Sequence, residues 1–425
     1  MALALEGIRV VDVSQVAAAP MAARHLADFG ADVIHIEHPV RGDSFRAYQA
    51  GQGGTGGVPS DINYTWENCN RNKRSVTLDI SQESGREIIY RLLAKADVFV
   101  SNLRPFEVEE FKLEYRTLRK LNPRLVYATV TAYGKDGPER NEPGYDATAY
   151  WARAGLPYAL SMPGIPCANF RTAIGDNVAA LALFSGIMTA LYARERTGVG
   201  QQVDVALFQT GVYVLSVDIA GALVTGKDYA DWTEQPPLEM LAEAIAATAR
   251  IAAFYKTQTL NPLATGYMTK DWRVILIIAL QPDRYWAKFC QAIERPDLQN
   301  DPRFNSLQAR AENREVLYPI LDEVFLSKTL EEWKSRLAGI PFALIQNLVE
   351  VINDPEARAN HYFVPIDHPT YGRIEVVANP INLSETPATL RMSAPEFGQH
   401  TEEVLLELGY TWEDIVQLKE QRIIA

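Results

Sequence analysis

The sequence is poor in cysteine and histidine, the residues that build disulfide frameworks and most zinc sites. Only three cysteines occur among 425 residues, at Cys69, Cys167 and Cys290, and they are far apart. This spacing indicates a reducing compartment and no disulfide framework. The six histidines form no motif, and no cysteine–histidine spacing resembles that of a zinc site. We therefore predict neither structural disulfides nor a bound metal.

Basic residues are also few relative to acidic ones. The chain has 41 lysines and arginines against 53 aspartates and glutamates, which gives a formal net charge of −12. A protein of this charge is not expected to bind the phosphate backbone of nucleic acids. The balance still allows a local basic pocket for a small anionic ligand.

Targeting and membrane-spanning features are missing as well. The N-terminal residues contain no basic region followed by an apolar one, so no signal peptide is predicted. No window approaches the roughly 18 uninterrupted apolar residues of a membrane span. With 47% hydrophobic and 22% charged residues, the composition is that of a globular protein. We expect a cytoplasmic protein of two or three domains.

The first 135 residues alternate short β-type runs with helical patterns. Repeated β-α-β order of this kind predicts an α/β fold with a mainly parallel sheet, covered by helices on both faces. Ligands of such sheets bind at the carboxyl ends of the strands. The predicted strands are Ile8–Val13, Ala31–Glu37, Ser75–Asp79, Asp97–Ser101 and Arg124–Thr131, and the predicted helices are Pro20–Phe29, Glu83–Ala96 and Val108–Leu121.

Beyond residue 215 the pattern changes to that of a smaller α+β domain. It contains one strong strand, Asp271–Leu280, and an alanine-rich helical stretch, Leu238–Ala253. From about residue 340 a mixed segment with a strand at Arg373–Ala378 and two terminal helices is suited to pack back on the first domain. The predicted boundaries are thus 1–215 for a large domain, 216–340 for a small domain and 341–425 for the returning segment.

Gly175 and Asp176 precede a long apolar stretch that stops at Gly198 and leads directly into a strand. We expect a helix that begins at Asp176. A carboxylate at a helix N-terminus is held ionised by backbone N–H groups and the helix dipole. Such a carboxylate serves either as an ordinary helix cap or as a covalent nucleophile.

Three further segments are candidates for ligand binding, each with a structural alternative. Tyr145 and Asp146 follow turn residues and enter a helix, which is also an ordinary helix start. The first β-α turn, Ser14–Pro20, is built from small residues, which allow either close approach of a ligand phosphate or tight packing. The basic run Asn70–Ser75 is either a phosphate site or a solvated surface. His38 follows a strand end within reach of a ligand, whereas the glycine-rich 51–60 lacks the context of a phosphate loop.

Taken together and in this order, these segments resemble the class III CoA-transferases of the CaiB/BaiF type, over essentially the whole chain. Their joint order carries the resemblance. The matching segments are Leu5–Val13, Ala19-Pro20, Leu26–Glu37, Asn70–Asp79, Ala96-Asp97, Asn102–Pro105, Leu121–Tyr127, Gly144–Asp146, Gly175-Asp176, Arg196–Asp204 and Asn261–Leu263.

The resemblance implies a Rossmann-like parallel-sheet large domain formed by both chain ends, a smaller central α+β domain, and an interlocked dimer. It implies that Asp176 attacks an acyl-CoA thioester and carries CoA as an aspartyl thioester. CoA thioesters are then substrates, and no cofactor is permanently bound. The partner chain is a second copy or a related subunit.

The resemblance also implies CoA contacts at matching positions. Val16 and Ala18 match first-turn contacts, and Arg104 is suited to a phosphate. Ala17 stands where formyl-CoA transferases have an assisting glutamine, and His38 replaces an arginine, so Lys73, Arg74 or Arg104 would have to compensate. The full set of expected CoA-binding residues is Val16, Ala17, Ala18, His38, Lys73, Arg74, Leu78, Asn102, Leu103, Arg104, Tyr145 and Asp146.

The sequence motifs do not identify the acids between which CoA is exchanged. Tyr150 and Trp151 either line an apolar substrate pocket or fill the core, since aromatic residues on helices are usually buried. Arg153 is suited to pair with a second carboxylate. The run Tyr145–Gly155 resembles that of transferases for bulky, aryl or branched acids rather than oxalate. This resemblance implies succinyl-CoA as donor and a bulky aryl- or alkyl-substituted acid such as benzylsuccinate as acceptor.

Other functions remain as alternatives. A 2-methylacyl-CoA racemase shares the fold, but its histidine is replaced by Tyr145, and a tyrosine of pKa about 10 is a poor proton relay near neutral pH. A dinucleotide-binding protein would use Glu37 to bind ribose, yet the turn Ser14–Pro20 has no glycine. A non-catalytic subunit of a heteromeric transferase is disfavoured by Asp176.

Overall fold

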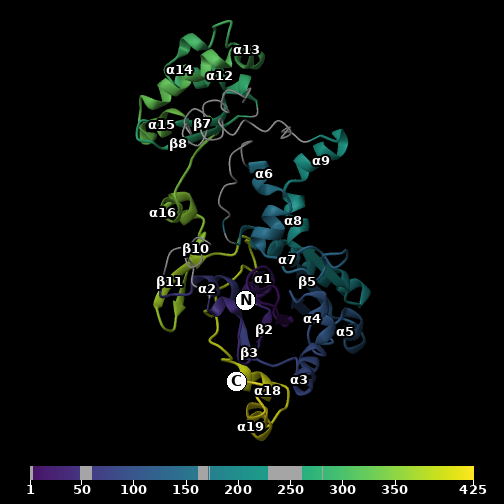
Figure 1. Ribbon diagram of the computed structural model, residues 1–425. Coiled ribbons are helices and arrows are strands. Elements are labelled where there is room, and N and C mark those ends of the chain that lie inside the picture. The colour runs from purple at the N-terminus through teal and green to yellow at the C-terminus, as the bar shows by residue number, and fades with distance from the viewer. Residues whose placement is uncertain (1–2, 48–59, 161–170, 172, 228–260, 280) are drawn as a thin grey trace, which may run out of the picture. The chain divides into compact units, whose positions relative to one another are not determined.

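The computed structural model describes residues 3–47, 60–160, 171, 173–227, 261–279 and 281–425 (Figure 1). The chain divides into two compact units. The first combines Met1–Trp232 with Asn360–Ala425, and the second is Thr233–Ala359. The unit boundaries therefore lie about 17 to 19 residues later than the predicted 215/216 and 340/341. The glycine-rich 51–59 and the predicted helix 238–253 lie outside the described residues.

The first unit contains the predicted parallel sheet. All neighbouring strands pair in parallel, in the order β3-β2-β1-β4-β5-β6. The order reverses between β1 and β4, whose carboxyl ends lie side by side and open a crevice at that edge. The strands are β1 Arg9–Val13, β2 Asp32–Glu37, β3 Arg74–Thr77, β4 Val98–Ser101, β5 Val126–Thr131 and β6 Gln202–Ala206.

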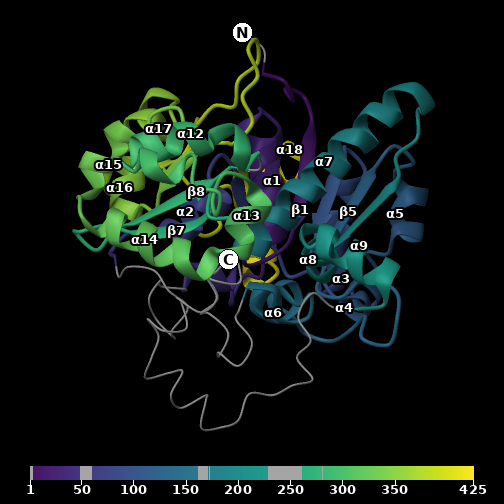
Figure 2. The ribbon, with the colours of Figure 1, turned by 90° about the horizontal axis from the view of Figure 1, so that it is seen from above.

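Helices cover both faces of this sheet, as the strand sequences require. Val10 and Val11 are neighbours in β1, both fully buried, and point into different apolar clusters. One cluster includes α1 (Ala18–Asp28) and α7 (Ile174–Thr197), which lie side by side (Figure 2). The other includes α3 (Glu83–Leu93). The prediction of a parallel α/β sheet is confirmed.

One face of helix α7 is buried in the core of the first unit. Among the described helices it is the single one long and apolar enough by itself to cross a membrane, and the bent pair α8 (Leu207–Val214) and α9 (Ser216–Thr225) passes the same test together. The buried face of α7 packs against α1 and β5 within the unit. The apolar composition of α7 is thus explained by the fold. It ends as predicted at Gly198, which adopts φ 72°.

The predicted helix Val108–Leu121 is wrong in one respect, because it is two helices. The first, α4 (Pro105–Glu110), ends before Lys112, which adopts a left-handed conformation with φ 59°. The second is α5 (Tyr115–Leu121). The chain reverses here so that Leu113 and Leu118 are both buried. The other helices of the unit are α2 Tyr64–Asn70 and α6 Leu156–Leu160.

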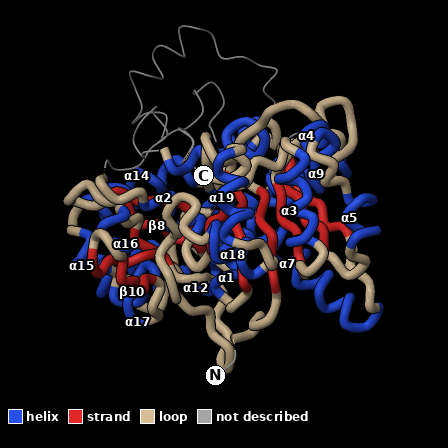
Figure 3. The backbone as a smooth tube through the Cα atoms, turned by 90° about the horizontal axis from the view of Figure 1, so that it is seen from below, coloured by secondary structure: helices blue, strands red, loops and turns tan. Residues whose placement is uncertain are grey.

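The C-terminal segment belongs to the first unit. It forms the antiparallel hairpin β10 (Phe363–His368) and β11 (Gly372–Val377), followed by α18 (Thr401–Glu407) and α19 (Trp412–Glu420) (Figure 3). The last residue, Ala425, donates its N–H to Thr77 Oγ1 of β3 at 3.0 Å. Apolar residues of α18 and α19 join the cluster that contains α3.

The second unit is a small α+β structure with its own core. Its antiparallel sheet orders β7 (Ala264–Met268), β8 (Val274–Ile278) and β9 (Phe342–Leu344). Aromatic and aliphatic residues share the core, and Tyr267 stacks on Phe325 with ring centroids 4.4 Å apart. Its helices are α12 Pro282–Ala292, α13 Leu307–Glu312, α14 Arg314–Leu326, α15 Leu330–Arg336, α16 Leu348–Asn353 and α17 Pro355–Ala359.

Candidate active site

A cavity of about 990 Å³ opens at the carboxyl ends of β1, β4 and β5. This is where open α/β sheets bind ligands. Nine of the residues expected from the sequence line it, namely Val16, Ala17, Ala18, Asn102, Leu103, Arg104, Tyr145, Asp146 and Asp176. The cavity therefore collects segments that are up to 192 residues apart in the chain, from Gln15 to Leu207.

The turn after β1 forms one wall of the cavity. Asn102 fixes this turn from the end of β4, because it accepts the Gln15 N–H at 3.0 Å and donates to the Gln15 carbonyl at 2.7 Å. Val16 is held at φ 70°, a left-handed conformation that a β-branched residue rarely adopts. The following Ala17 and Ala18 are buried and expose little side chain toward the cavity. A ligand can therefore approach the backbone of the turn closely.

Asp176 lies in the first turn of α7 and lines the cavity, with 9% of its surface exposed. The helix begins at Ile174 rather than at Asp176, and the expected capping role is wrong because the N-cap residue is Ala173. No described residue donates a hydrogen bond to the Asp176 carboxylate. Its oxygens are thus free to react with a ligand in the cavity.

The helix N-terminus does not keep the pKa of Asp176 at its ordinary low value. Burial, and secondarily the negative charge of Asp146, raise the pKa of Asp176 to about 7. Removal of water disfavours the charged carboxylate more than the helix dipole favours it. Asp176 is consequently a carboxyl group that changes its charge near neutral pH.

Asp146 is the neighbouring buried carboxyl group. It belongs to a π-helical segment, Asp146–Ala152, a rare conformation that often occurs at functional sites. Its Oδ1 accepts the Gly175 N–H at 3.0 Å. Burial raises the pKa of Asp146 to about 6, against the effect of this and other backbone hydrogen bonds. Asp146 thus links the π-helical segment to the start of α7.

Only glycine fits at position 175, because the backbone there lies close to Asp146 and Tyr150. A Cβ atom at position 175 would lie 2.2 Å from Cγ of Tyr150 and 2.3 Å from Oδ1 of Asp146. Atoms cannot approach so closely, and the obstacles are a buried ring and a hydrogen-bonded carboxylate. The absence of a side chain at Gly175 therefore allows Asp176 to sit beside Asp146.

The pKa of Asp176 predicts the pH dependence of the reaction if its carboxylate is the nucleophile. The ionised form is the reactive one, so kcat/KM for the CoA thioester should rise with pH and level off above about 7. Initial rates between pH 5 and 9 measure this profile. A rate that is flat over the whole range, or that falls as pH rises from 5 to 7, would contradict the assignment.

Four expected CoA ligands lie outside the cavity lining. Lys73 is fully buried, and its Nζ binds Asp12 at 2.9 Å and Asn70 at 2.8 Å. Arg74 is bound to Asp32 and Glu407, each at 2.7 Å. Both cations are already neutralised by carboxylates, so neither is available to a phosphate. Leu78 is part of the core that includes α3, and His38 Nδ1 accepts two N–H groups of its own loop.

The expected substrate-pocket residues do not line the cavity either. Tyr150 is 2% exposed and packs in the core. Of the two roles expected for this residue, core packing is therefore the one that the structure has. Trp151 packs partly buried against the same core. Arg153 is exposed and pairs with Glu139 at 2.9 Å. The π-helical conformation of Asp146–Ala152 could not be predicted from the sequence. This conformation determines which of these side chains face inward.

Several lining residues were not predicted. The most relevant are Arg140 and Arg171, neither of which forms an ion pair within the described part of the chain. Arg104, which was predicted, is instead paired with Glu107 at 3.1 Å. A sequence signal for Arg140 would have been its place in the polar loop that follows the carboxyl end of β5. Across the ranges that the structure describes, no group of three or more metal-binding side chains is present.

Comparison with known proteins identifies the family. The pattern of the family described as CoA-transferase family III matches residues 5–401. The chain is 33% identical to (R)-2-hydroxy-4-methylpentanoate CoA-transferase of Clostridioides difficile over 424 residues, which cover 99% of both chains. It is 31% identical to cinnamoyl-CoA:phenyllactate CoA-transferase of Clostridium sporogenes, over 98% of this chain and 96% of the relative.

Solved structures agree with the sequence relatives. A CaiB/BaiF family protein from Brucella suis is 27% identical, has a TM-score of 0.77 and is matched over 96% of this chain and 100% of its own. A protein from M. tuberculosis is 28% identical, with a TM-score of 0.76 over 94% of this chain and 99% of its own. The relatives support neither a racemase nor a dinucleotide-binding protein specifically. The chain is a transferase that belongs to CoA-transferase family III.

Proposed function

We propose that this protein moves CoA from an acyl-CoA donor to a free carboxylic acid through an aspartyl-CoA thioester on Asp176. The observation that carries the proposal is the position of Asp176, at the cavity, without a hydrogen-bond donor among the described residues. A thioester carbonyl that enters this cavity meets a carboxylate with free lone pairs. Burial also favours the chemistry, because anhydride intermediates hydrolyse in contact with water.

The steps balance without a co-reactant. An Asp176 oxygen attacks the thioester carbonyl, the carbon–sulfur bond breaks, and CoA leaves as a thiolate from a mixed anhydride. The thiolate then attacks the side-chain carbonyl of Asp176 and releases the donor acid, which keeps one oxygen of Asp176. The acceptor carboxylate reverses both steps and restores the Asp176 carboxylate. Two covalent steps thus replace direct attack of one acid on a distant thioester.

The half-reaction tests this sequence directly. When enzyme is mixed with succinyl-CoA and no acceptor, the proposal expects release of one succinate per active site in a rapid burst. Steady-state kinetics with an acceptor should then be ping-pong. Absence of a burst together with ternary-complex kinetics for every active donor would contradict the covalent route.

The unpaired arginines at the cavity are the proposed phosphate ligands of CoA, in place of Lys73 and Arg74. A guanidinium suits a phosphate because it donates two parallel hydrogen bonds. Arg140→Met should raise KM for the acyl-CoA about fivefold and change kcat little, since hydrogen bonds to charged groups contribute modestly at an exposed site. Arg153→Met is the matched control, because Arg153 pairs with Glu139 away from the lining. Equal KM values in the two variants would remove Arg140 from the site.

The acceptor is proposed to be an acid with a bulky apolar substituent. Relatives act on 2-hydroxy acids of this kind by name, such as 2-hydroxy-4-methylpentanoate and phenyllactate. Another relative is named succinyl-CoA--L-malate CoA-transferase beta subunit, from Chloroflexus aurantiacus. We therefore place branched or aryl 2-hydroxy acids beside aryl-substituted succinates such as benzylsuccinate, with succinyl-CoA as a donor. If these acids compete for a limiting amount of one acyl-CoA donor, the yields of the products rank the acids as acceptors.

We also propose that two chains associate, as either a homodimer or a heteromer. The support is the apolar surface of α9, which has no buried residue and carries Val217, Leu223 and Val224 at 84%, 81% and 86% exposure. An exposed apolar patch of this kind usually marks a protein interface. Sedimentation should give twice the chain mass, whereas a stable monomer with full activity would remove this proposal.

A further inference from the structure

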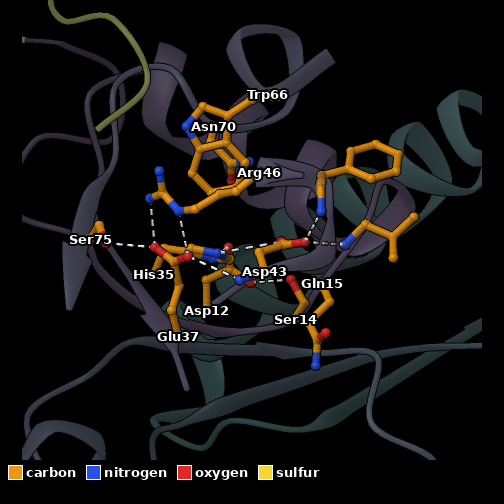
Figure 4. Close-up of polar contacts among 12 residues, drawn as sticks. Asp12, Ser14, Gln15, His35, Glu37, Asp43, Arg46, Trp66, Asn70 and Ser75 are labelled. Atoms are coloured by element: carbon orange, nitrogen blue, oxygen red, sulfur yellow. Dashed lines mark hydrogen bonds and ion pairs between the residues drawn. The ribbon is translucent and has the colours of Figure 1, made fainter. Parts of the chain in front are cut away.

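A buried network of charged groups lies behind the turn that lines the cavity. Asp12 on β1 is fully buried, and its Oδ2 lies 2.9 Å from both His35 Nδ1 and Lys73 Nζ. The other ring nitrogen of His35, Nε2, faces Oδ2 of Asp43 at 3.6 Å (Figure 4). Two carboxylates and two cations therefore balance each other when His35 is protonated. Burial of unpaired charge is very costly, so this balance favours the charged imidazole.

Asp43 connects this network to the cavity wall. Its Oδ1 accepts the N–H of Val16 at 3.1 Å and that of Phe45 at 2.9 Å. Val16 and Phe45 both line the cavity. Within the described part of the chain, the remaining oxygen of Asp43 has no donor near it other than the His35 ring that it faces. One carboxylate thus links a buried cation to the backbone of the ligand-binding turn.

The turn needs such a link because its conformation is strained. Val16 adopts φ 70°, and left-handed backbone in a β-branched residue persists only where the surroundings impose it. Asn102 fixes the preceding residue, Gln15, through hydrogen bonds to its N–H and its carbonyl. Asp43 is the described side chain that binds the N–H of Val16 itself. Among the residues that the structure describes, no other side chain binds the Val16 N–H, so loss of Asp43 removes this restraint on the left-handed form.

We propose that Asp43, oriented by His35 and Asp12, is a positioning residue that holds Val16 in its left-handed conformation and so shapes the wall against which the CoA thioester binds. The inference rests on the proposed function in one respect, namely that the ligand of this wall is a CoA thioester. Asp43 touches neither the ligand nor Asp176, and it acts through the turn.

Asp43→Asn tests the proposal because it preserves size and removes charge. The amide N–H of asparagine would face the N–H of His35, so the side chain must turn away from either the histidine or Val16. We expect KM for the acyl-CoA to rise about tenfold while kcat stays within about threefold. Calorimetric binding of free CoA should weaken by the same factor. This binding measurement is independent of turnover, so it separates failure of the positioning role from failure of the proposed transferase reaction.

Two further variants separate positioning from general destabilisation. Val16→Gly accepts a left-handed φ without strain, so in this background Asp43→Asn should change KM less than about threefold. Ser75→Ala removes a hydrogen bond to Glu37 in the neighbouring part of the network, 2.6 Å long, and should lower the melting temperature without changing KM. If Asp43→Asn leaves KM and CoA binding unchanged, or if Ser75→Ala raises KM equally, the positioning role is wrong.

The wild-type chain gives a second readout should Asp43→Asn fail to fold. His35 faces Asp12, Asp43 and Lys73, and the two carboxylates raise its pKa to about 9 despite burial. KM for the acyl-CoA should therefore increase as pH rises through about 9, and increase less in Val16→Gly. A KM that stays flat to pH 10 in the wild type would overturn the proposal.

Discussion

Replacement of Asp176 by asparagine is expected to lower kcat by at least about 10⁴-fold, as removal of other covalent nucleophiles does. Asparagine has the size of aspartate, but its amide nitrogen is not a nucleophile and cannot form the anhydride. The neighbouring carboxyl group of Asp146 does not replace it, because its Oδ1 is bound to the Gly175 N–H. The measurement is kcat for CoA transfer, with melting temperature as the folding control.

The same substitution is expected to stabilise the protein at alkaline pH. The pKa of Asp176 is about 7 in the folded chain and 3.8 in its ordinary state. The folded state thus binds the proton more tightly, and wild-type stability falls as pH rises from about 4 to about 7. A neutral asparagine avoids this loss, which is on the order of 4 kcal/mol.

Melting temperatures at two pH values test whether the substitution stabilises the protein at alkaline pH. Asp176→Asn should melt several degrees above the wild type at pH 8, and the difference should shrink toward pH 4. Loss of activity together with a lower melting temperature at pH 8 would mean that Asp176 mainly stabilises the fold.

Replacement of Gly175 by alanine is expected to have the second largest effect. The new methyl group would overlap Tyr150 and Asp146, at 2.2 and 2.3 Å. The start of α7 must then shift by about 1 Å, and displacement of a reacting group by this amount costs about 10²-fold in rate. Overpacking should also destabilise the protein by about 1–3 kcal/mol.

Gly221→Ala in α9 is the matched control for this substitution. Gly221 is also helical, and a Cβ atom at its position meets no atom within 4 Å. Alanine is the better helix former, so Gly221→Ala should raise the melting temperature slightly. Because α9 is also the proposed association surface, kcat of this variant is compared with the wild type only where sedimentation shows the same oligomeric state. If Gly175→Ala retains wild-type kcat and melting temperature, the close approach of Gly175 to Asp146 does not matter for the site.

The sheet was predictable from the sequence because its signals are local. Each strand is a short β-branched run between turn residues and a helical pattern, and the order of these runs implies parallel pairing. The turn Ser14–Pro20, which contains Val16, could be placed at the cavity because it follows the carboxyl end of a strand, whereas Asn102 was placed there by the family resemblance. Gly175-Asp176 was readable as a helix start, although the exact first residue was not.

The basic run Asn70–Ser75 shows why other site residues could not be predicted. Its lysine and arginine look like phosphate ligands, yet Lys73 points inward to Asp12, 61 residues away, and Arg74 binds Asp32, 42 residues away. The sequence around a lysine or arginine does not show ion-pair partners that are this far away in the chain. The ionisation of Asp176 escaped prediction for a related reason, because burial is a property of the folded chain and not of the helix start alone.

The most direct test of the account is intact-mass spectrometry of the protein after incubation with succinyl-CoA and a panel of other acyl-CoAs, beside Asp176→Asn. We expect a CoA-sized adduct in the wild type that hydroxylamine removes, and none in the variant. An equal adduct in the Asp176→Asn protein, or turnover of a donor with no adduct even when the reaction is quenched before acceptor is added, would contradict Asp176 as the covalent carrier of CoA.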